Sequence, residues 1–180
     1  MLEEKRRLLE EMNKLQHRYE LSETVGPDYF EPGMMEYLDK YLGKYDNDNQ
    51  EMIIRFEAKG TRYEGRTEIL ERTYTGDSIA VVREKDNPYN SNNFKLIDSK
   101  KHNLGNMPAE LCNAIAPLYD AGEAEFIGSH ISFVDPLSKR SRYAKQAVFF
   151  VELHIGISME EELLRKDEAE EMFDFLDGLM

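Results

Sequence analysis

Five short segments in the middle of the chain constrain its fold more than any other feature. The first is apolar and β-prone, the second is a four-residue apolar run that follows the turn residues Gly76 and Asp77, and the third alternates apolar and polar side chains. The segments cover residues 52–56, 79–82, 94–98, 123–134 and 147–155. Short strands separated by turns predict a mainly β (α+β) fold.

Helical patterns interrupt and flank these strands. Within the β-rich region, Leu111, Ile115 and Leu118 form one apolar stripe between Pro108 and Gly122, which predicts a helix. We also expect helices within 2–21 and 34–42, and a C-terminal helix that is capped by Ser158 and ends before Gly178. The chain is therefore divided into a helical N-terminal extension (1–50), a β-rich domain (51–156) and an acidic C-terminal helix (157–180).

The charge of the chain is unevenly distributed. The formal net charge is −13, which disfavours broad, non-specific binding to nucleic acid. Residues 1–52 contain 7 basic and 13 acidic side chains, residues 156–180 contain 2 and 9, and residues 53–155 contain 14 of each. The acidity belongs to the flanks, so a local positive surface on the central domain remains compatible with the composition.

Composition also suggests a compartment. No apolar run approaches the roughly 18 residues that a membrane-spanning helix needs, so we expect no membrane span. Residues 1–7 are charged and no apolar stretch follows, so no signal peptide is expected. The single cysteine, Cys112, suits a reducing compartment, and we expect a cytoplasmic protein.

A loop rich in asparagine carries the strongest chemical signal. It follows the strand that ends in Arg83, and its sequence is Asp-Asn-Pro-Tyr-Asn-Ser-Asn-Asn from position 86. Asparagine amides donate and accept hydrogen bonds at once, and Tyr89 offers a flat face on which a base can stack. The alternative is a tight turn whose asparagines bond their own backbone, and residue types alone favour that interpretation.

The order of several elements resembles the HIRAN domain family. These elements are Gly76-Asp77, Val81-Val82-Arg83-Glu84, Asp86-Asn87-Pro88-Tyr89, Asn92, Leu104-Gly105, Pro108 and a helix over 110–122, preceded by Arg62-Tyr63. The resemblance covers about residues 53–155 and implies an OB-like, HIRAN-type β-barrel core between the helical extensions. It also implies single-stranded DNA or a DNA 3′ end as ligand, as in some eukaryotic DNA-repair remodelling ATPases.

The resemblance assigns roles to individual residues. Arg62 and Tyr63 would contact the terminal nucleotides, and Tyr89 would stack on a base. Asn87 and Asn92 would shape the loop or bond the end. Where the family usually has an aspartate that takes part in recognising the terminal hydroxyl, this chain has Asn90, and where it usually has histidine or tyrosine the chain has Asn106. An amide accepts a hydrogen bond without the strengthening charge of a carboxylate.

A basic run with an aromatic inside it lies between the last two expected strands. Its members are Lys139, Arg140, Arg142, Tyr143 and Lys145. We predict phosphate contacts there, and a solvated hairpin loop is the equally weighted alternative.

Two other function classes remain as alternatives. The first is a protein-interaction or regulatory protein, in which the barrel is a scaffold and the acidic helices contact a partner. The stripe Leu8, Met12, Leu15 and Tyr19 then forms a seam with a second copy or another protein, although packing on the barrel is the commoner outcome.

The second alternative is a metal-dependent nuclease. Glu57 and Lys59 have the Glu-x-Lys spacing of such enzymes, with Asp46 or Asp48 upstream. The triplet arises easily by chance in a chain with 33% charged residues. The four histidines lie apart in the sequence and Cys112 lies on an apolar helix face, so we expect no enzyme, no metal and no cofactor.

Overall fold

A computed structural model of the chain describes residues 1–24, 43–63 and 65–164, and for residues 16–24 it describes the backbone only. The helix expected within 34–42, the side chain of Tyr19 and most of the C-terminal helix lie outside this part. Residues 161–164 are helical, as expected for the start of the C-terminal helix. No described helix is long and apolar enough to cross a membrane.

Within the described residues, seven strands form two antiparallel sheets. The first has the order β1-β2-β7-β6 and contains β1 (Lys44–Asp46), β2 (Glu51–Glu57), β7 (Val148–Ile157) and β6 (Ala124–Asp135). The second has the order β3-β4-β5 and contains β3 (Ile79–Glu84), β4 (Asn93–Asp98) and β5 (Asn103–Asn106). All five expected strands are present within one or two residues at each end, and β1 and β5 are additional.

Strand β2 shows why these segments become strands. Its burial alternates along the chain, with Met52, Ile54 and Phe56 buried and the residues between them half-exposed. A period of two places one set of side chains on the inner face of a sheet. Most of the buried apolar residues of both sheets, and those of helix α4 (Ala109–Asp120), belong to one hydrophobic core.

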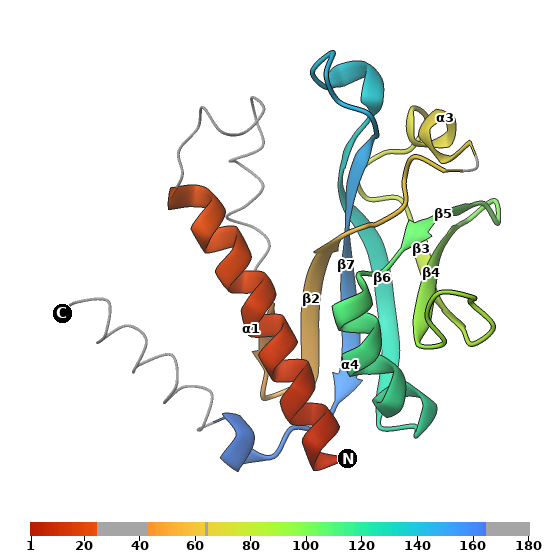
Figure 1. The fold of residues 1–180 in the computed structure, drawn as a ribbon. Coiled ribbons are helices and arrows are strands. Elements are labelled where there is room, and N and C mark those ends of the chain that lie inside the picture. Colours follow the sequence, from red (N-terminus) through yellow and green to blue (C-terminus); the bar gives the residue numbers. More distant parts are fainter. Residues whose placement is uncertain (25–42, 64, 165–180) are drawn as a thin grey trace.

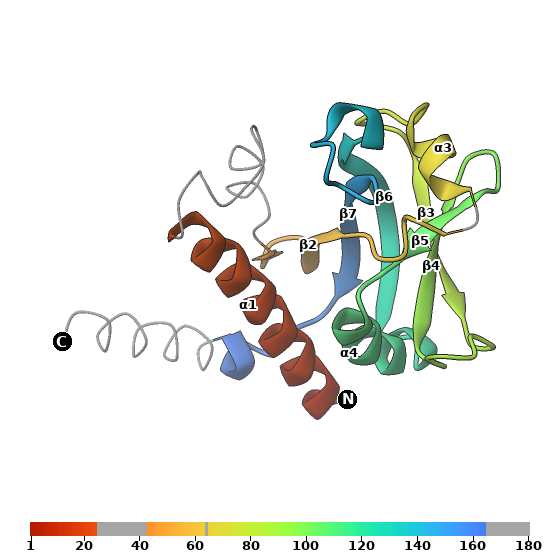
Figure 2. The same ribbon diagram turned by 45° about the horizontal axis from the view of Figure 1, so that its top comes forward.

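The two sheets do not close into a continuous barrel. Within the described part of the chain they share no continuous ladder of paired strands, and the backbone pairs between them are isolated bridges, one between Ser78 and His130 and one between Lys59 and Asn106. In Figures 1 and 2 the three-stranded sheet lies on one side of β2, β7 and β6. The expected mainly β fold with helices is therefore present, whereas the expected barrel is not confirmed.

Helix α1 (Leu2–Thr24) lies on the opposite side of the four-stranded sheet from β3, β4 and β5 (Figures 1 and 2) and contacts α4. Leu8, Leu9, Met12 and Leu15 are all buried within this single chain. Of the two interpretations of the apolar stripe, the structure shows packing on the chain's own core.

Strand β1 pairs with β2 in a hairpin, and Asp46, the last residue of β1, accepts hydrogen bonds from Asn49 in the turn. The expected boundary between residues 50 and 51 falls in this hairpin. The segment 1–50 thus contributes a helix and one strand of the sheet.

The docking of α1 can be tested by truncating one buried leucine. Leu8 is fully buried, so Leu8→Ala is expected to lower the free energy of unfolding by about 2–5 kcal/mol. The matched control is Leu2→Ala on the same helix, since Leu2 is 44% exposed, and we expect it to change stability by less than about 0.5 kcal/mol. Urea denaturation followed by circular dichroism measures both, and equal effects would show that α1 is not docked.

Candidate functional site

The segment that carries Arg62 and Tyr63 is attached to the edge of the second sheet. Lys59 and Asn106 exchange two backbone hydrogen bonds of 2.9 Å. This approach requires a glycine beside Asn106, because a Cβ on Gly105 would lie 2.6 Å from the carbonyl oxygen of Lys59. The Leu104-Gly105 element therefore fixes where the chain carries Tyr63.

Three side chains converge over Gly60, whose φ of +74° favours glycine. A Cβ at this position would lie 3.1 Å from Arg66 Nη1, 3.3 Å from Asn106 Nδ2 and 3.7 Å from Tyr63 Cδ2. Arg66 is buried and donates to the carbonyl of Gly60 at 2.8 Å. The result is a polar corner with Tyr63 beside it, and Tyr63 is 52% exposed.

The asparagine loop is held by its own amides. Asn87 Oδ1 accepts from the backbone N–H groups of Tyr89 and Asn90, both at 2.9 Å. Asn90 Oδ1 accepts from the backbone of Asn92 at 3.0 Å. Asn90 and Asn92 both donate to Asn113 Oδ1 on α4. These amides shape the loop, which is the alternative that residue types alone favour.

Arg83 clamps the same loop to the end of α4. Its guanidinium forms two bonds of 3.1 Å to the carboxylate of Asp120 and donates to the carbonyls of Ser91 and Asn93 at 2.6 and 3.2 Å. It also lies over the ring of Phe94, 5.4 Å from the centroid. The planar fork of arginine suits this arrangement of several simultaneous acceptors.

A chain of hydrogen bonds joins the two parts of the site. Asn87 Nδ2 and Asn93 Nδ2 both donate to Glu84 Oε1, at 2.6 and 2.9 Å, and Asn93 Nδ2 also donates to Asn106 Oδ1 at 3.0 Å. The loop of Tyr89 and the corner of Tyr63 therefore lie along one face of the second sheet.

Glu84 sets the direction of this chain. An ionised carboxylate only accepts, so the amide of Asn93 must present its nitrogen to Glu84, and Asn106 must present its oxygen to Asn93. Asn106 Nδ2 then donates to no other described residue, and it lies beside Gly60 at the corner where Tyr63 also lies. Burial acts to raise the pKa of Glu84, but the hydrogen bonds from Asn87 and Asn93 outweigh it and the pKa is lowered.

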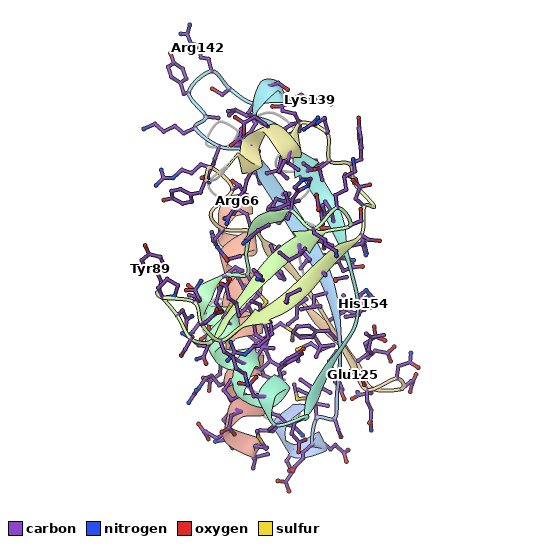
Figure 3. The ribbon with its side chains drawn as sticks, turned by 90° about the vertical axis from the view of Figure 1, so that its right-hand side faces the viewer. Arg66, Tyr89, Glu125, Lys139, Arg142 and His154 are labelled. Atoms are coloured by element: carbon purple, nitrogen blue, oxygen red, sulfur yellow. The ribbon has the colours of Figure 1, made fainter. Side chains whose placement is uncertain are left out.

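Tyr89 stands out from this fixed loop with 96% of its surface exposed. In Figure 3, Tyr89 and Arg142 project from the same side of the molecule, and Arg66 lies between them. Tyr63 lies beside Arg66 at Gly60, and the hydrogen-bond chain from Asn106 to Asn87 connects this corner to the loop of Tyr89.

The basic run lies in the loop between β6 and β7, which begins with a 3-10 turn, η2 (Leu137–Lys139). Arg140 is mostly buried and forms an ion pair of 3.2 Å with Asp135, so its charge is used inside the fold. Lys139, Arg142, Tyr143 and Lys145 are exposed. The structure separates one structural arginine from four residues available to a ligand.

The carboxylates of Asp46 and Glu57, which the nuclease alternative would need at one metal site, do not come together. Asp46 pairs with Glu51 at the start of β2, whereas Glu57 ends the same strand, and six residues of extended chain span roughly 20 Å. In the described ranges, no group of three or more His, Cys, Asp or Glu side chains is arranged to hold a metal ion.

Two histidines that are distant in sequence lie beside the same carboxylate, that of Glu152, on the four-stranded sheet. His130 Nε2 and His154 Nε2 lie 3.5 and 3.0 Å from Glu152 Oε2. Burial acts to lower the pKa of His154, but its hydrogen bonds to Glu152 and Glu51 outweigh this effect and raise the pKa.

Cys112 is buried, and desolvation raises the pKa of its thiol to about 11, as expected for a packing residue.

Several residues that hold the site had no role in the sequence-based hypothesis. Asn113, Asn93 and Asp120 anchor the loop, and Arg83 and Glu84 were matched as sequence elements without a function. The sequence signal that could have suggested Arg83, Glu84 and Asn93 is their position in or next to matched elements, since Arg83 and Glu84 belong to one and Asn93 follows Asn92.

These features define a small β-rich domain that presents exposed tyrosines on loops fixed by hydrogen bonds. The HIRAN domain model matches residues 52–152, and the chain belongs to this family. No curated protein sequence matches the chain significantly.

Three solved structures are similar at low sequence identity. The HIRAN domain of human HLTF shares 19% identity over 65% of this chain and 81% of that one, with a TM-score of 0.40. The HLTF HIRAN domain in its DNA-bound conformation shares 20% over 64% and 82%, with a TM-score of 0.41. A Lactobacillus plantarum protein shares 16% over 58% and 97%, with a TM-score of 0.44.

Replacement of Arg83 tests what fixes the loop. Arg83→Ala removes charge-assisted bonds from a side chain that is only 10% exposed, and we expect it to lower the free energy of unfolding by about 2 kcal/mol. Amide hydrogen exchange at Asn90 and Asn92 should also accelerate. Lys85→Ala is the control, because Lys85 is 71% exposed and 4.0 Å from the same carboxylate, and it should cost less than about 0.5 kcal/mol. Unchanged exchange in Arg83→Ala would contradict the clamp.

The lowered pKa of Glu84 predicts a pH dependence of known sign. A carboxyl whose pKa is depressed by folding stabilises the fold fully above its usual value, here 4.5, and loses this contribution as the pH falls through the lowered pKa. We expect Glu84→Gln to be less stable than the original chain at pH 7, with a difference that shrinks below about pH 4.5. Denaturation at several pH values measures this, and a constant difference would refute it.

Proposed function

We propose that this chain is a non-enzymatic module that binds single-stranded DNA at a 3′ end, through the face that carries Tyr63, Asn106 and Tyr89. The single observation that carries the proposal is Tyr89, an almost fully exposed ring on a loop held by hydrogen bonds at both ends. A rigidly presented ring loses little conformational entropy when a base stacks on it.

The polar corner supplies a second contact of suitable chemistry. Asn106 Nδ2 fits an oxygen acceptor, such as a phosphate or a base carbonyl, and Arg62 adds a positive charge beside Tyr63. Arg62 lies 5.0 Å from the Tyr63 ring centroid and donates to the Tyr63 hydroxyl at 2.9 Å. A nucleotide stacked on Tyr63 would thus meet a cation and an amide donor together.

Membership in the HIRAN family agrees with an unpaired end as the ligand. Recognition of the terminal group must differ from the usual pattern, because Asn90 replaces the aspartate and both atoms of its amide are already bonded to Asn92 and Asn113. We therefore assign the polar contact with the terminal nucleotide to Asn106 rather than to Asn90.

Fluorescence anisotropy with 5′-labelled oligonucleotides tests this proposal at low salt. A linear single strand is compared with a covalently circular strand of the same length, a linear strand with a 3′ phosphate and a blunt duplex. We expect the linear strand with a free 3′ end to bind most tightly. Tyr89→Ala should cost about 1–3 kcal/mol of binding free energy, the usual contribution of one stacked base.

Two variants make this measurement specific. Tyr89→Phe keeps the ring and should retain binding, whereas Tyr74→Ala removes another exposed tyrosine, 68% exposed, and should have no effect. Equal affinity for circular and linear strands would reject end recognition. Absence of binding to every oligonucleotide would reject the function and favour the protein-interaction alternative.

A further inference from the structure

Two Arg-Tyr pairs in distant parts of the sequence have the same local geometry. Arg142 lies 4.8 Å from the ring centroid of Tyr143 and donates to its hydroxyl at 2.7 Å. The corresponding values for Arg62 and Tyr63 are 5.0 and 2.9 Å. Tyr143 is 76% exposed, so a flat surface beside a positive charge is presented to solvent.

This arrangement matches what an unpaired nucleotide needs. The guanidinium lies against the ring, which leaves ring surface for a base and N–H groups for a phosphate. Lys139 and Lys145 are exposed in the same loop, and residues 136–147 contain no acidic side chain. In a chain of net charge −13, this hairpin loop is a local positive surface.

The two pairs are attached to each other through the fold. Thr61, which precedes Arg62, is buried and donates to the carbonyl of Ala147 at the base of the hairpin loop, at 2.6 Å. At the other side of the loop, Ser138 bonds the carboxylate of Glu71, just after α3 (Arg66–Leu70). Figure 3 shows Arg142 and Tyr89 on one side of the molecule with Arg66 between them.

We propose that Arg142 and Tyr143 form a second stacking platform for the strand whose end binds near Tyr63 and Tyr89. The inference rests on the proposed function and deepens it, because the ligand becomes a stretch of several nucleotides rather than a terminal nucleotide alone. Arg140 is excluded from the platform, since it is paired with Asp135 inside the fold.

The test is a length series of 5′-labelled oligothymidylates with free 3′ ends, from two to twelve nucleotides, measured by anisotropy with the full chain. Affinity is expected to rise with length and then level off once the strand reaches the hairpin loop. The double variant Arg142→Ala/Tyr143→Ala should bind long strands about tenfold more weakly, the order of one lost stack, and leave the shortest bound strand unaffected.

Matched variants separate stacking from charge and from misfolding. Lys100→Ala/Tyr74→Ala removes one exposed cation and one exposed ring from other loops and should leave binding unchanged at every length. Tyr143→Phe should behave like the original chain. Thermal unfolding of each variant should match the original, because both replaced side chains of the hairpin loop are exposed.

Each outcome decides one of the two proposals. Affinity that does not change with length, or equal losses for short and long strands in the double variant, overturns the second platform while the end-binding function stands. If the original chain binds none of the oligonucleotides, the proposed function itself is rejected. A tenfold loss confined to long strands supports the platform.

Discussion

The backbone pairing between Lys59 and Asn106 is the contact on which the arrangement of the site depends. It joins the end of the four-stranded sheet to the edge of the three-stranded sheet, and it requires the missing side chain of Gly105. Because the chain is held there, Gly60 turns directly over Asn106 and the following residues carry Tyr63 to the same face. The other backbone bridge between the two sheets among the described residues, from Ser78 to His130, joins β6 to the residue that precedes β3 and does not hold β5.

Glu84 gives this face its chemical direction. Its carboxylate accepts hydrogen bonds from two asparagine amides. This fixes the orientation of the Asn93 amide, which in turn requires the oxygen of Asn106 to accept and leaves the nitrogen of Asn106 as a donor. A hydroxyl or a second amide at position 84 would allow either orientation, because both groups donate as well as accept. One half-buried carboxylate thus fixes the orientation of several amides, and it explains why so many asparagines can lie together without competing.

The strands could be predicted from the sequence wherever their side chains alternate or form apolar runs, as in 52–56 and 147–155. Strand β5 could not, because its sequence Asn-Leu-Gly-Asn has little intrinsic strand preference and is held by β4 and by Lys59. The short α3 was missed for a similar reason, since only Arg66 and Leu70 of its five residues are buried. Tertiary contacts, rather than local propensity, determine both elements.

The site shows the same division. The exposed tyrosines and the constrained loop could be predicted from residue types, but the roles of the asparagines could not. In the sequence, an asparagine whose amide bonds its own loop looks the same as one whose amide is available to a ligand. Only the positions of Asn113 and Glu84 distinguish them. The basic run illustrates the limit as well, since Arg140 and Arg142 are two residues apart and one is buried against Asp135 while the other is exposed.

The acidity of the chain bears on how a polyanion would be held. Charges separated by more than about 8 Å are largely screened at physiological ionic strength. The acidic flanks therefore repel a phosphate bound far from them less than one bound close to them. Stacking on Tyr63, Tyr89 and Tyr143 acts only at contact and carries no charge. In the function proposed here, aromatic faces therefore provide most of the attraction, and the few exposed cations of the neutral central domain offset repulsion locally rather than drive binding along any stretch of nucleic acid.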